Sequence, residues 1–106
     1  MPTIVITGLG ASTPLGGDLA TTWDALVSGR SGVHRIQEDW ADDLATKIAA
    51  RAMVDPASKL DRVEARRLDR STQFALVSAM EAWADAGFGL GDDNPVDRDR
   101  LLVSLA

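Results

Sequence analysis

Two apolar runs near the ends of the chain, residues 4–9 and 101–105, contain no charged side chain and constrain the fold most strongly. An uncharged apolar run of this length is typical of a strand that is buried on both faces, as in a parallel sheet. Stretches with helical periodicity lie between the two runs. Alternation of strands and helices predicts an α/β fold in which right-handed crossovers join parallel strands.

The first helical stretch is expected to begin at Asp18. A carboxylate at this position accepts bonds from backbone N–H groups and meets the positive end of the helix dipole. Gly29 suits the residue that follows and ends a helix. Between them, one apolar stripe recurs at helical spacing and predicts the buried face. The stripe comprises Leu19, Trp23, Leu26 and Val27.

The strongest helical signal covers residues 71–86, where an alanine-rich apolar face recurs at i, i+3 and i+4. Small side chains let this helix lie close to a neighbour, and Gly87 is expected to end it. Asp55, followed by a proline, is a helix-start signal and predicts a short helix over residues 57–63. Residues 47–54 alternate loosely and predict a short edge strand.

The glycine-rich turn after the first apolar run raises the question of phosphate binding. Gly8 and Gly10 fit the first two positions of the dinucleotide fingerprint, but Thr13 occupies the third. Pro14 then removes a backbone donor from the turn, and the helix signal starts only at Asp18. The Walker A pattern is also absent. The sequence therefore disfavours nucleotide binding and predicts that the glycines serve a tight turn.

The composition excludes several other classes of function. The 106 residues suffice for one compact domain, and they contain no cysteine, which excludes disulfides and thiolate chemistry within them. The net charge of −5 argues against a nucleic acid partner. No apolar run approaches the roughly 20 residues that span a bilayer. The N-terminus has no basic segment before its apolar run, so we expect no signal peptide and a cytoplasmic location.

Two longer stretches resemble one family. These are "VITGLGASTPLGGDLATTWDALVSGRSGV" and, further along, "RRLDRSTQFALVSAMEAWADAG". They resemble the amino terminus of the β-ketoacyl-[acyl-carrier-protein] synthases, and in particular of the elongating type II enzymes of actinobacteria. The resemblance implies a thiolase-like fold, layered α/β/α/β/α in the full protein. It also implies that residues 1–106 are the N-terminal portion of that domain, truncated before the catalytic cysteine.

The resemblance further implies an acyltransferase activity for the full-length protein. Members of this family elongate acyl chains in fatty acid biosynthesis by decarboxylative Claisen condensation of an acyl thioester with a malonyl carrier protein. Their catalytic cysteine and two histidines have no counterpart in this chain, and His34 matches no catalytic position and is expected at the surface. We therefore expect no catalytic residue, cofactor or metal here, an inactive isolated chain, and a homodimer at full length.

One functional element is expected within the chain. Arg62 and Arg66 share a helix face at i, i+4, and Arg67 lies beside Arg66. In the family, basic residues at the positions of Arg66 and Arg67 contact the acidic acyl carrier protein, and Arg62 is an additional candidate. The alternative is a solvated helix whose arginines pair internally with the neighbouring acids. Those acids are Asp61, Glu64 and Asp69.

Other functions remain as alternatives at this point. The chain also suits a fragment of a polyketide ketosynthase or of its cysteine-lacking chain-length partner. A non-catalytic module that docks a carrier protein through its arginines belongs to a different class, and it predicts that these residues fold cooperatively by themselves. A nucleotide-binding domain is the third class, and it predicts a measurable nucleotide affinity.

Overall fold

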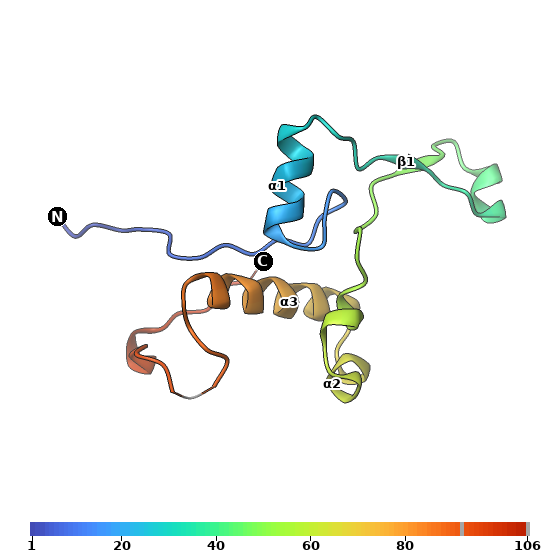
Figure 1. Ribbon diagram of the computed structural model, residues 1–106. Coiled ribbons are helices and arrows are strands. Elements are labelled where there is room, and N and C mark those ends of the chain that lie inside the picture. The colour runs from blue at the N-terminus through green and yellow to red at the C-terminus, as the bar shows by residue number, and fades with distance from the viewer. Residues whose placement is uncertain (92, 106) are drawn as a thin grey trace.

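A computed structural model of the chain describes residues 1–91 and 93–105, so Asp92 and Ala106 lie outside the description (Figure 1). Helix α3 crosses the middle of the molecule, with α1 on one side and α2 on the other, and a small hairpin projects away from the helices. In chain order the elements are α1 (Leu19–Val27), β1 (His34–Arg35), η1 (Asp39–Asp43), β2 (Ile48–Ala49), η2 (Pro56–Lys59), α2 (Arg62–Arg67), α3 (Arg70–Asp85) and η3 (Arg98–Arg100).

The bounds of the two main helices confirm the sequence prediction. The buried face predicted for α1 is wrong, because Trp23, Leu26 and Val27 are all more than half exposed and the buried residue of this helix is Ala25. Asp18 caps α1, accepting a bond from the backbone N–H of Thr21 at 2.8 Å, and Asp69 caps α3 in the same way. Each helix is followed by a glycine with a positive φ, 68° at Gly29 and 87° at Gly87. Only glycine adopts this conformation readily, which explains why the helices end where the sequence predicted.

The predicted helix over residues 57–63 is wrong in its bounds, because two short elements replace it. Asp55 caps a 3₁₀ turn, η2, through the backbone N–H of Ala57. Leu60 is then extended, with φ −113° and ψ 156°, and breaks the helical hydrogen bonding. Asp61 caps the next helix, α2. A second capping carboxylate six residues after the first thus restarts the helix in a new direction.

The edge strand expected within residues 47–54 is confirmed only over Ile48–Ala49. It pairs antiparallel with a strand that the sequence did not predict, His34–Arg35, in the register His34 to Ala49 and Arg35 to Ile48. This hairpin is the one sheet that the described ranges contain.

The two apolar runs that predicted a parallel sheet form no strand in residues 1–91 and 93–105, and that prediction is wrong for the structure as it stands. Both runs are extended and exposed, with Ile4 at 92% and Leu102 at 87% of full exposure. A strand needs a hydrogen-bonding partner, and neither run lies against another strand. Their apolar character therefore marks surface that this part of the chain leaves uncovered.

Little of the described chain is fully buried. The buried hydrophobic side chains are Ala25, Ala41 and Val77, together with Pro56. The radius of gyration is 17.3 Å, against about 13 Å for a compact domain of this length. The accessible surface is 8484 Å², against about 5,700 Å² for a folded monomer of this mass. The structure is therefore a partial α/β domain, with helices and a two-stranded sheet but no continuous core.

Candidate functional site

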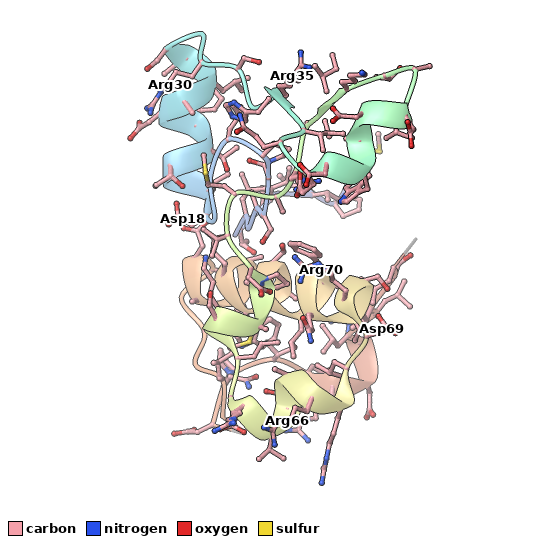
Figure 2. All side chains as sticks on the ribbon, turned by 90° about the vertical axis from the view of Figure 1, so that its right-hand side faces the viewer. Asp18, Arg30, Arg35, Arg66, Asp69 and Arg70 are labelled. Atoms are coloured by element: carbon pink, nitrogen blue, oxygen red, sulfur yellow. The ribbon has the colours of Figure 1, made fainter. Side chains whose placement is uncertain are left out.

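The arginines predicted as a binding site all lie on α2 (Figure 2). Asp61 starts this helix by accepting bonds from the backbone N–H groups of Val63 and Glu64, at 2.9 and 3.4 Å. Because the cap precedes Arg62 directly, the helix brings Arg62 and Arg66 onto one face, as the i, i+4 spacing predicted. All three arginines are exposed. We refer to Arg62, Arg66 and Arg67 as the basic face of α2.

The acids around the basic face, which are Asp61, Glu64 and Asp69, form no ion pair with its arginines within the described residues. Asp61 caps α2, and Asp69 caps α3 by accepting from the backbone N–H of Thr72 at 2.8 Å. This bond, together with one from the Ser71 hydroxyl, holds the pKa of Asp69 below its ordinary value. No arginine of the basic face forms an ion pair with a described residue. The three positive charges therefore face solvent without an internal carboxylate partner.

Arg70 is close in sequence but differs in structure. Its guanidinium bonds the Asp55 carboxylate at 3.0 Å and lies over the Phe74 ring, 5.2 Å from the ring centroid. Figure 2 shows Arg66 at the outer edge of the molecule on α2, whereas Arg70 lies beside α3 on the side facing the hairpin. Of the four clustered arginines, the structure thus uses one to join α3 to η2 and leaves three available.

Sequence analysis missed the residue that supports the basic face. Gln73, on α3, is the buried polar residue among those described, and its amide nitrogen donates to the backbone carbonyls of Ala65 and Leu68. A signal was present, because Gln73 lies one helical turn before Val77 on the buried side of α3. A polar residue on a buried face calls for a partner.

The glycine-rich turn packs against α3 and offers no free backbone donors at two central positions. The N–H of Leu9 donates to the Asp85 carboxylate at 2.9 Å, and that of Ala11 donates to the Glu81 carboxylate at 2.8 Å. A side chain at Gly10 would clash with the Ser78 carbonyl, and one at Gly8 with the backbone of α3 at Ala82. The glycines therefore allow close backbone contact with a helix, which further disfavours a phosphate site.

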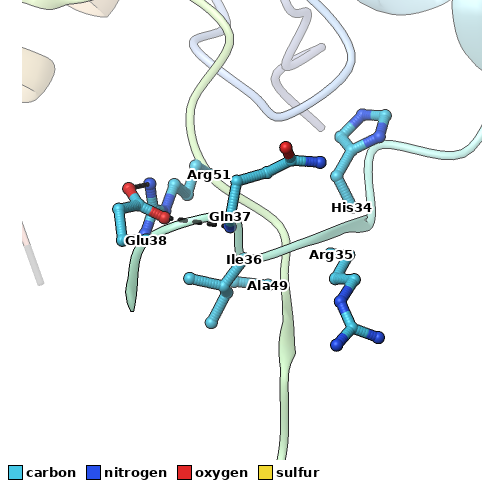
Figure 3. A pocket seen from close by; sticks show the side chains of 7 residues that line it. All are labelled: His34, Arg35, Ile36, Gln37, Glu38, Ala49 and Arg51. Atoms are coloured by element: carbon cyan, nitrogen blue, oxygen red, sulfur yellow. Dashed lines mark hydrogen bonds and ion pairs between the residues drawn. The ribbon is translucent and has the colours of Figure 1, made fainter. Parts of the chain in front are cut away.

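A small pocket of about 250 Å³ lies beside the hairpin (Figure 3). An ion pair between Glu38 and Arg51 forms one wall, and this bond holds the pKa of Glu38 below its ordinary value. Arg51 also lies over the Trp40 ring, 6.0 Å from its centroid. His34 is exposed at the rim, as predicted. The lining residues are His34, Arg35, Ile36, Gln37, Glu38, Ala49 and Arg51.

The described residues offer neither a metal site nor a membrane-spanning helix. No group of three or more His, Cys, Asp or Glu side chains among them is placed to hold a metal ion. Within the same ranges, every helix is too short or too polar to cross a membrane.

Comparison with known proteins identifies the class. The family model described as "Beta-ketoacyl synthase, N-terminal domain" matches residues 1–104, so the chain belongs to this family. Membership implies a thiolase-like fold, of which the helices and small sheet form part. The resemblance to the β-ketoacyl-[acyl-carrier-protein] synthase family, stated from the two sequence motifs, is thereby confirmed, and its actinobacterial type stays a prediction.

Named relatives narrow the family further. The chain is 42% identical over 92 residues to a 3-oxoacyl-[acyl-carrier-protein] synthase 2 of Coxiella burnetii, covering 86% of the chain and 22% of that protein. It is 38% identical over 96 residues to a protein of the same name from Staphylococcus aureus, covering 90% of the chain and 23% of the relative. The chain thus spans between a fifth and a quarter of the length of these curated relatives.

Proposed function

We propose that the chain is the N-terminal portion of a 3-oxoacyl-[acyl-carrier-protein] synthase II, an acyltransferase of fatty acid biosynthesis. The observation that carries the proposal is the match to the ketosynthase N-terminal domain over residues 1–104, with synthase 2 relatives at 38–42% identity. The exposed apolar runs support it, since in a layered α/β/α/β/α fold residues 4–9 and 101–105 become strands of a core sheet.

The proposed reaction uses groups outside these residues. A cysteine thiolate displaces the carrier thiol from an acyl thioester and becomes acylated. A malonyl carrier protein loses CO₂, and the carbanion that forms attacks the enzyme thioester. A carbon–carbon bond is made and the cysteine thiolate leaves. Since residues 1–106 contain no cysteine, we expect the isolated chain to be inactive and to act as scaffold.

The basic face of α2 is the functional site that we assign within the chain, with an acidic acyl carrier protein as its partner. Three exposed arginines without internal ion pairs support this assignment, as does the position of Arg66 and Arg67 in the family motif. Exposed charges at the rim of an interface mainly raise the encounter rate and make it sensitive to salt. The family resemblance also leads us to expect a cytoplasmic homodimer that needs no metal or organic cofactor.

The test is a double charge reversal, Arg66→Glu with Arg67→Glu, in the complete synthase. We expect the KM for acyl carrier protein substrates to rise about tenfold or more, with kcat little changed. The KM for a small acyl thioester without the carrier protein should stay the same. Arg30→Glu with Arg35→Glu, an equal double charge reversal at exposed positions away from α2, is the matched control. An unchanged KM for the carrier substrate in the double variant would refute the assigned site.

A further inference from the structure

The support for the basic face comes from a single side chain on the neighbouring helix. Gln73 is only 9% exposed, and its amide nitrogen lies 2.6 Å from the Ala65 carbonyl and 3.2 Å from the Leu68 carbonyl. These two carbonyls stand immediately before Arg66 and immediately after Arg67. Gln73 therefore holds the backbone on both sides of the pair of arginines.

Helix α2 needs such support because it is short. It has six residues, from Arg62 to Arg67, and isolated helices of that length are unstable in water. Its N-terminus is capped by Asp61, but Leu68 is already extended, with φ −101° and ψ 139°. The last carbonyls of a helix lack partners within it. The amide nitrogen of Gln73 donates to two carbonyls at the C-terminal end of α2. Figures 1 and 2 both show α2 lying beside the start of α3.

We propose that Gln73 is a positioning residue for carrier protein docking: by fixing the last turn of α2, it sets the direction in which Arg66 and Arg67 project. This inference rests on the docking function proposed above. Gln73 itself touches no partner, because it is buried between the two helices. Its effect is to keep the arginines in one arrangement before the partner arrives, which reduces the ordering that binding requires.

The variant that tests this role is Gln73→Met in the complete synthase. Methionine keeps the length and apolar bulk of the side chain but cannot donate to the two carbonyls. We expect the KM for the carrier substrate to rise about three- to tenfold, with kcat and the KM for a small acyl thioester unchanged. Amide hydrogen exchange in residues 62–68 should become faster, while exchange in α1 stays the same.

Two controls separate positioning from a general loss of stability. Ser78→Ala removes another partly buried contact of α3, the 3.3 Å contact with the Ser12 hydroxyl, and should leave the carrier KM unchanged. Gln73→His retains one ring N–H donor and should raise the carrier KM less than Gln73→Met does. If Gln73→Met fails to fold, Gln73→His tests the positioning role by the same two measurements, the carrier KM and amide hydrogen exchange in residues 62–68. Because histidine replaces two donors with one, the positioning role still predicts a measurable rise in the carrier KM.

Arg66→Ala, measured beside these variants, distinguishes the two proposals. If Arg66→Ala raises the carrier KM and neither Gln73 variant does, the positioning role is overturned and the docking site stands. If Arg66→Ala leaves the carrier KM unchanged, the docking site fails and the positioning role fails with it. An equal rise in the KM for the small thioester would also overturn the positioning role, because the damage would then not be confined to docking.

Discussion

The first turn of α3 binds its neighbour through a neutral amide, whereas the last two turns bind theirs through carboxylates. Gln73 donates to carbonyls at the end of α2, while Glu81 and Asp85 accept backbone N–H groups from the opening segment. The difference follows from what each neighbour presents. A helix C-terminus leaves carbonyls without partners, and the irregular turn leaves N–H groups without partners.

The two contacts also differ in how close the backbones come. Gly8 and Gly10 bring the opening segment directly against the backbone of α3, with no room for a side chain. Between α2 and α3 a long side chain fills the space instead. We therefore expect the glycine contact to tolerate substitution least and the capped first turn of α3 to tolerate it best.

The largest loss of stability is expected for Gly10→Val. Its added side chain meets the Ser78 carbonyl and lies 2.9 Å from the Ala82 nitrogen, so two backbones must separate. We expect a loss of about 3 kcal/mol or more in the free energy of unfolding of the complete protein, measured in urea. Gly89→Ala is the control, since nothing lies within 4 Å of its added Cβ. Equal stabilities for the two variants would show that the close contact is not formed.

A smaller loss of stability is expected for Glu81→Gln. The half-buried carboxylate accepts from Ala11 at 2.8 Å with one oxygen and from Leu19 at 2.7 Å with the other. An amide keeps one acceptor but turns its NH₂ group toward the second N–H. We expect a cost of about 1–3 kcal/mol in the free energy of unfolding. Asp24→Asn, an exposed change of the same type on α1, should cost less than about 0.5 kcal/mol, and a matching loss there would contradict the bridging role of Glu81.

The smallest expected effect is on the pH dependence of stability, through the Asp69 cap at the start of α3. Bonds from Thr72 and Ser71 lower the pKa of Asp69 from its ordinary value of 3.8. The folded state is therefore stabilised by the ionised group above pH 3.8, and this contribution disappears as the pH falls through the lower folded value. Asp69→Asn keeps a capping oxygen and should reduce the acid dependence of the thermal midpoint between pH 5 and 2. A wild-type acid dependence in the Asp69→Asn variant would argue against the cap.

Local features of the fold could be predicted from the sequence. Asp18, Gly29 and Gly87 act on their own backbone neighbourhood, so their roles as caps and helix ends follow from residue type and spacing. The strands predicted at residues 4–9 and 101–105 are not formed in the part of the chain that the structure describes. A strand exists only when another segment supplies its hydrogen-bonding partners, and apolarity identifies the need for a partner without supplying one.

In the candidate site, too, the local features could be predicted from the sequence, whereas those that depend on the arrangement of the helices could not. The grouping of Arg62 and Arg66 follows from helical spacing alone. That the acids leave them unpaired does not follow from spacing, because Asp61 and Asp69 could either pair with arginines or cap helices. In the structure both are caps, Asp61 before α2 and Asp69 at the bend between α2 and α3. The role of Gln73 depends on the same bend, which brings carbonyls five and eight residues earlier within reach of its amide.

The contacts of the opening segment have a consequence for biosynthesis. Leu9 and Ala11 bond to side chains that follow 76 and 70 residues later in the chain. At translation rates of roughly 5–20 residues per second, the apolar N-terminal run waits several seconds before α3 exists to receive it. During that interval it is an uncovered, uncharged segment that favours aggregation. We therefore expect the nascent chain to leave this apolar segment uncovered until α3 has been made.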